Sequence, residues 1–178
     1  MTSHPAPHGP HGSLMEADRT RWPADSAECA EPAGREATRR GVALVRAYAR
    51  GDSATIAAAL DTTDPEVRAQ LPSVTRDVLG LVVGVVFSGP HTLTPADVVR
   101  TADRIAAAGP PHHEPGAVRA VRAWASRDDA LLRASWQGEA AGAHGRAVLA
   151  AALAVAAWGE APFLHLLAAF DELTAAHG

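Results

Sequence analysis

Two stretches of the chain show almost the same order of residue types: "VRAYARGDSATIAAAL", from Val45 to Leu60, and "VRAWASRDDALLRASW", from Val121 to Trp136. In the first, Gly51 stands where a left-handed residue ends a helix, and Asp52 stands where a side chain caps the next one. Each stretch is therefore predicted to be a helical hairpin. Arg127 occupies the position of Gly51 in the second stretch, so we expect that hairpin to end its first helix by a different geometry.

The segments that follow the first hairpin also have helical spacing. An Asp-Pro-Glu start at Asp64 opens a long apolar run, and Thr94 before Pro95 opens a further helix. The residues expected to share the inward face of the long run are Val67, Leu71, Val74, Val78, Leu81 and Val85. Pro72 is predicted to kink or split this helix.

The similarity between the two parts extends beyond the hairpins. At a spacing of 68 residues, Val98 corresponds to Leu166 and Asp103 to Asp171. We therefore predict an internal duplication and an all-α fold of about eight helices. The two similar four-helix halves, residues 36–109 and 116–178, would form a pseudo-twofold helical bundle. Chance similarity within an alanine-rich helical composition is the alternative.

Each half contains one helix that is apolar on nearly all sides, over Val78–Phe87 and Ala147–Trp158. Such helices are typical of the centre of a bundle, and both are expected there. Gly80 and Gly84 lie one turn apart and are expected to let two backbones cross closely. On this interpretation Gly84→Leu overfills the crossing and destabilises the fold.

Composition limits the class of protein. A chain of 178 residues with 47% apolar and 4% aromatic residues suits a single domain with a core of closely packed alanine-rich helices. Residues 1–35 carry Pro, Gly, His and Ser without an apolar period and are predicted to be a disordered tail before one domain at 36–178. All 16 basic residues are arginines, a bias typical of a GC-rich bacterial genome.

Charge and cysteine content bear on location and partners. A net charge of -4 argues against general nucleic-acid binding. The apolar stretch Ala147–Phe170 is interrupted by Glu160 and His165, so no membrane association is expected. The single Cys29 excludes an intramolecular disulfide framework, and the chain opens without a recognisable signal peptide. The expected location is cytoplasmic.

A row of arginines is the first candidate binding site. Successive residues of a helix turn by about 100°, which puts several arginines of the first helix on one side. These are Arg35, Arg39, Arg46 and Arg50. Guanidinium groups match carboxylates in geometry, so this side is expected to bind a partner protein with an acidic surface. A solvated helix face is the alternative.

The sequence contains no complete catalytic motif, which favours a non-catalytic protein interaction, adaptor or regulatory domain over an enzyme. One alternative is a small-molecule-binding regulator with an apolar pocket between the halves. Its lining would be Tyr48, Trp124, Trp136 and Trp158. A metal-dependent or carboxylate enzyme is the other alternative, with Asp103, Asp171 and His165 as acid–base candidates.

Histidines are the only metal ligands that the sequence brings together. His4, His8 and His11 lie in the tail, and His112 and His113 lie in the loop between the halves. Removal of Met1 would leave a terminus whose His4 completes a square-planar nitrogen set for Cu(II) or Ni(II), and flexible imidazoles also bind Zn(II). No other cofactor is expected, and a polar loop is the alternative for the histidines at 112 and 113.

Overall fold

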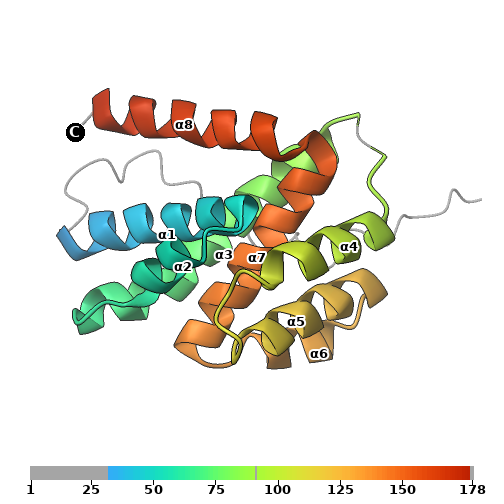
Figure 1. Ribbon diagram of the computed structural model, residues 1–178, viewed down its shortest axis with the longest axis horizontal. Coiled ribbons are helices and arrows are strands. Elements are labelled where there is room, and N and C mark those ends of the chain that lie inside the picture. Colours follow the sequence, from blue (N-terminus) through green and yellow to red (C-terminus); the bar gives the residue numbers. More distant parts are fainter. Residues whose placement is uncertain (1–31, 91, 177–178) are drawn as a thin grey trace, which may run out of the picture. The chain divides into compact units, whose positions relative to one another are not determined.

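The computed structural model describes residues 32–90 and 92–176, and helices are the only regular secondary structure in this part of the chain (Figure 1). It contains eight helices, which confirms the predicted all-α class. They are α1 (Pro32–Arg50), α2 (Ser53–Leu60), α3 (Pro65–Ser88), α4 (Pro95–Ala106), α5 (Glu114–Ser126), α6 (Asp129–Ser135), α7 (Glu139–Trp158) and α8 (Glu160–Ala176). The first helix thus begins before residue 36, where the domain was predicted to start. The predicted tail lies mainly outside the described residues.

Local capping explains where several helices begin. The Asp52 carboxylate accepts a hydrogen bond from the Thr55 amide at 3.0 Å, and the Thr94 hydroxyl accepts one from the Asp97 amide at 3.2 Å. Both predicted caps are therefore confirmed, and each satisfies an amide that has no partner within its helix. Pro72 does not split α3, which continues from Pro65 to Ser88.

The two hairpins have the same connecting geometry. Gly51 has a φ of 68° and Arg127 a φ of 59°, both in the left-handed region. The amides of Asp52 and Asp128 each donate 2.9 Å hydrogen bonds to the carbonyl of the residue five positions earlier. The expectation that Arg127 ends its helix differently is wrong, because the hydrogen bonds of the turn hold a non-glycine residue in this conformation. Whether the halves arose by duplication stays a prediction.

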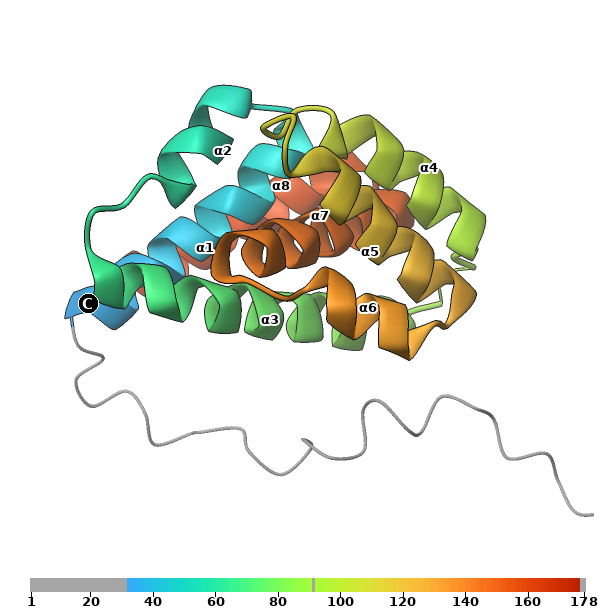
Figure 2. The ribbon, with the colours of Figure 1, turned by 90° about the horizontal axis from the view of Figure 1, so that it is seen from below.

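Helix α7 forms the centre of the bundle. Every residue from Gly142 to Val155 except Arg146 is buried, and α1, α3, α4 and α5 pack around this helix (Figure 2). Six of these thirteen buried residues are alanines and two are glycines, so the surrounding helices approach closely. The predicted central position is confirmed for this helix.

Helix α3 does not lie in the centre, contrary to the prediction. Its buried face consists of Val67, Leu71, Thr75, Leu79, Val82 and Val86. Leu81 and Val85, which were expected to face inward, are 49% and 48% exposed. A side chain at Gly80 or Gly84 would meet no other atom within 4 Å, so the expected close crossing does not occur there within the described structure. Apolar residues occupy both the buried and the exposed side of α3, so the sequence pattern does not show which side faces the core.

Within the described residues, two helices are long and apolar enough to cross a membrane by length and composition alone, namely α3 and α7. In α7 this composition has a structural explanation, because 72% of its apolar window is buried inside the bundle. In α3 only 28% of the window is buried. The exposed apolar surface of α3 therefore needs another explanation.

Helix α8 lies at the edge of the bundle and contacts α1 and α7 (Figure 1). Phe163 is buried, with its ring centroid 6.2 Å from that of Trp158, whereas Leu166 is 52% exposed. Val98, the predicted counterpart of Leu166, is fully buried in α4. The last helices of the two halves therefore have different environments.

Candidate functional site

The four arginines predicted to bind a partner are not equivalent in the structure. Arg35 and Arg50 are exposed on α1, whereas Arg46 is half-buried and donates a 3.2 Å hydrogen bond to the Leu167 carbonyl of α8. Arg39 donates two hydrogen bonds to Glu36, at 2.8 Å and 2.6 Å. These bonds, together with one from Arg40, lower the pKa of Glu36 to about 2. At least two of the four guanidinium groups thus have partners within the chain.

The four aromatic residues predicted to line a pocket occupy different parts of the bundle. Tyr48 is buried beside the N-terminal half of α7, and Trp124 and Trp136 pack around Leu132 between α5 and α6. Trp158 is the last residue of α7, 14 positions beyond His144, which corresponds to about 21 Å along a helix. Trp158 therefore does not share a site with Tyr48.

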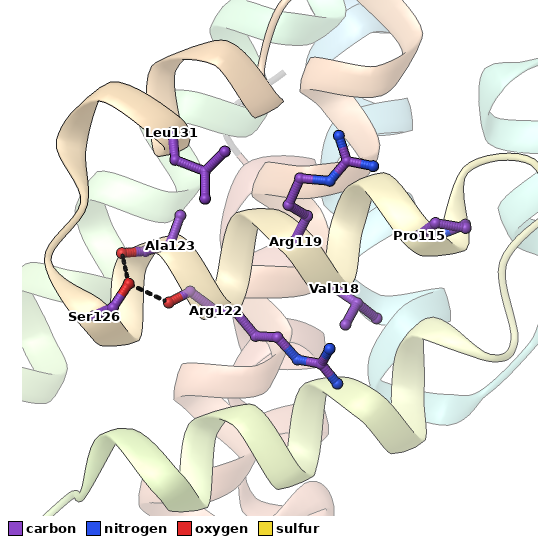
Figure 3. A pocket seen from close by; sticks show the side chains of 7 residues that line it. All are labelled: Pro115, Val118, Arg119, Arg122, Ala123, Ser126 and Leu131. Atoms are coloured by element: carbon purple, nitrogen blue, oxygen red, sulfur yellow. Dashed lines mark hydrogen bonds between the residues drawn. The ribbon is translucent and has the colours of Figure 1, made fainter.

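A surface pocket of about 400 Å³ lies along α5 (Figure 3). It is lined by Pro115, Val118, Arg119, Arg122, Ala123, Ser126 and Leu131, none of which belongs to the predicted aromatic set. The guanidinium groups of Arg119 and Arg122 point in different directions in Figure 3. Arg122 forms an ion pair with Asp103 of α4 at 3.4 Å. This arrangement connects two helices and offers no convergent set of polar groups.

The histidines predicted to bind metal fall into two groups. His4, His8 and His11 lie outside the described residues. The rings of His112 and His113 lie together, with centroids 4.0 Å apart. In residues 32–90 and 92–176, no three His, Cys, Asp or Glu side chains are placed to hold a metal ion. His165, the candidate general base, is exposed on α8, and the side chain of Asp171 is not described.

The histidine that the sequence analysis missed is His144, which forms a fully buried polar contact inside the bundle. Its Nδ1 atom is hydrogen-bonded to the hydroxyl group of Tyr48 in α1, and each of the two residues is 1% exposed. The ring of His113 packs against that of His144, with ring centroids 4.2 Å apart. The cluster joins α1, the start of α5 and α7.

Burial determines the protonation of this cluster. It lowers the pKa of His144 to about 3, with smaller contributions from His113 and His112, and it raises the pKa of Tyr48. At neutral pH the His144 ring is therefore uncharged, and its tautomer sets which partner donates in the bond between Nδ1 and the Tyr48 hydroxyl. The pKa of His113 is also lowered, by burial first and by His112 second. His144 is thus neutral and too weak a base for proton transfer at neutral pH.

A local signal for His144 exists in the sequence. It stands within "GAHGR", Gly142 to Arg146, the only polar interruption of an otherwise apolar helix after its first turn. A polar residue inside such a helix requires a partner from another element. The partner, Tyr48, lies 96 residues away, which no local pattern reveals.

Comparison of the chain with protein-family models, with curated proteins and with solved structures gives no match.

Proposed function

We propose that this protein is a non-catalytic interaction domain that binds an amphipathic helix of a partner protein on the exposed side of α3. The observation that carries the proposal is the exposure of three large apolar side chains on one half of this helix. Leu81 is 49%, Val85 48% and Phe87 57% exposed. Neighbouring large apolar side chains that remain in contact with water are typical of interaction surfaces.

The geometry of α3 favours a helix as the bound element. Gly80 and Gly84 lie beside Leu81 and Val85, and the space above both glycines is open. The absence of a side chain at these positions lets the backbone of a partner approach α3 closely. An amphipathic helix can pack its own apolar side chains against such a surface.

Polar residues continue the same side of α3 towards its N-terminus. Arg76 and Asp77 are 66% and 75% exposed in their side chains. An apolar centre with charged residues of both signs at its rim is the usual composition of a protein–protein interface. In Figure 2, α3 runs along the lower edge of the helical body.

Site-specific crosslinking in the cells of origin tests this proposal. A photoreactive phenylalanine analogue at position 87 is expected to form an adduct with another protein, and the crosslinked peptide should map to an amphipathic helix. The same analogue at exposed Arg104 of α4 serves as the control and should not form this adduct. Introducing Leu81→Asp into the position-87 chain should abolish it while leaving the melting temperature nearly unchanged, because Leu81 is half exposed.

The other outcomes contradict the proposal and identify the alternative. An adduct of two copies of this chain would assign the surface to self-association. An adduct with lipid would assign it to a membrane. Absence of any adduct at position 87, or equal adducts at positions 87 and 104, would remove α3 as a docking surface.

A further inference from the structure

A second feature, independent of the proposed docking surface, lies where α6 meets α7. Within the described residues, four buried side-chain nitrogen atoms have no hydrogen-bond partner, and three of them belong to two neighbouring residues. These three are Nε and Nη1 of Arg146 and Nε1 of Trp136. All three are N–H donors, and none of them is paired with an acceptor.

The charge of Arg146 is also uncompensated. Its Cζ atom lies 4.9 Å from the centroid of the Trp136 ring, a cation–π contact that stabilises the charge but accepts none of the in-plane N–H bonds. Burial lowers the pKa of Arg146, and the positive charge of Arg76 on α3 lowers it further. In the described part of the chain, no carboxylate forms an ion pair with Arg146. A half-buried cation without a paired carboxylate is stabilised when an anion binds next to it.

Two glycines of α7 make room for this arrangement. A Cβ atom at Gly142 would lie 2.7 Å from Arg146 Nη1 and 2.8 Å from the Trp136 carbonyl oxygen. A Cβ atom at Gly145 would lie 3.2 Å from Trp136 Cδ1. Glycine inside a helix lowers the stability of that helix. The two glycines of α7 are therefore best explained by the close packing of Trp136 and Arg146 against the α7 backbone, which a larger residue would prevent.

We propose that Arg146 and the indole of Trp136 form a binding site for a small oxyanion, either a phosphate or a carboxylate. Both groups present several acceptor oxygens with negative charge, which matches the guanidinium edge and the indole N–H. The donors lie below the surface, so the anion enters by displacing the connection between α6 and α7. That connection is short, and its Gln137 and Gly138 are exposed.

Nuclear magnetic resonance of the tryptophan indole N–H groups tests the proposal directly. The Trp136 signal is assigned by its loss in Trp136→Phe. Inorganic phosphate and acetate are added separately, with sodium chloride at equal ionic strength as the reference. We expect phosphate, acetate or both to shift the Trp136 signal beyond the effect of chloride and to raise the melting temperature, because a ligand that binds only the folded state stabilises it. A response to phosphate alone assigns a phosphate ligand, and a response to acetate alone a carboxylate.

Arg146→Met separates the site from nonspecific effects. Methionine keeps an unbranched apolar stem against Trp136 and removes the donors, so both anion responses should disappear while the spectrum stays that of a folded protein. Arg133→Met, at an exposed arginine of α6, is the matched control and should respond like the wild type. Anion responses that persist in Arg146→Met, or a wild-type response no larger than that to chloride, would overturn the proposal. Neither result depends on the outcome of crosslinking at α3.

Discussion

A buried polar atom needs a hydrogen-bond partner inside the protein, and the Tyr48 hydroxyl and His144 Nδ1 are partners for each other, whereas His144 Nε2 has none. The same enclosure that makes this bond necessary keeps His144 neutral, because charging the ring would leave an ion in an apolar surrounding. The bond between the two residues joins α1 to α7. Because His144 is kept neutral in the folded protein, the stability of the protein should depend on pH.

The free energy of unfolding should fall as the pH is lowered below about 6.5. In the unfolded chain His144 takes up a proton at its ordinary pKa of 6.5, whereas in the folded chain its pKa is about 3. Between these values the unfolded state binds more protons, so acid favours it. From about pH 7 to about pH 5 the loss is about 2 kcal/mol. Denaturant unfolding across this range measures it.

Two substitutions control for other titrating groups. His144→Gln should reduce the slope of stability against pH, and His113, whose pKa is lowered in the same direction, contributes to the slope that remains. His165→Gln, at an exposed histidine of α8, is the control for replacing a surface histidine. Equal slopes for His144→Gln and the wild type would show that His144 titrates normally in the folded protein.

At the scale of helices, glycine has opposite roles in α1 and α3. Gly41 lies where α1 crosses α3, and a Cβ atom there would clash with the Cγ1 atom of Val74. Gly41→Ala should therefore destabilise the protein by about 1–3 kcal/mol, through overpacking of the crossing. Gly84→Ala should stabilise it by about 0.5–1 kcal/mol, since alanine favours the helix and the space is open.

Thermal or denaturant unfolding of the two alanine variants checks these opposite signs. The comparison also tests the placement of α3, because Gly84→Ala is favourable only where the helix surface is free. Destabilisation by both substitutions would indicate that the glycine side of α3 packs against another element.

At the scale of the molecule, we expect the bundle to be more stable around α7 than at α8. Helix α7 is buried over most of its length, whereas among the described side chains of α8 only Phe163 is buried. Arg46 helps to hold α8 through its bond to the Leu167 carbonyl. Local unfolding of α8 should therefore need less free energy than global unfolding.

Hydrogen exchange of backbone amides checks this difference. The amides of α8 should exchange faster than those of α7 in the wild type. Arg46→Met should increase exchange in α8 further and leave that in α7 nearly unchanged, and Arg50→Met, at an exposed position of α1, is its control. Uniform protection across both helices would mean that α8 unfolds only with the whole bundle.

The sequence by itself determined the features that depend on neighbouring residues. The helical class follows from the spacing of apolar residues, and the helix starts after Asp52 and Thr94 follow from side chains that bond amides three positions away. The central position of α7 was also predictable, because a helix that is apolar on all sides requires cover on all sides.

Tertiary structure alone decided the rest, because it brings together residues that are distant in the chain. Helices α3 and α7 are both apolar over a long stretch, but only α7 is covered by other helices on most of its surface. Which of the two lies in the centre depends on how all the helices pack, and the sequence pattern of α3 does not contain this information. Tyr48 meets His144 across 96 residues, and Arg46 meets Leu167 across 121. Local propensity carries no information about such contacts, which is why the cluster around His144 and the donors of Arg146 emerged only from the folded chain.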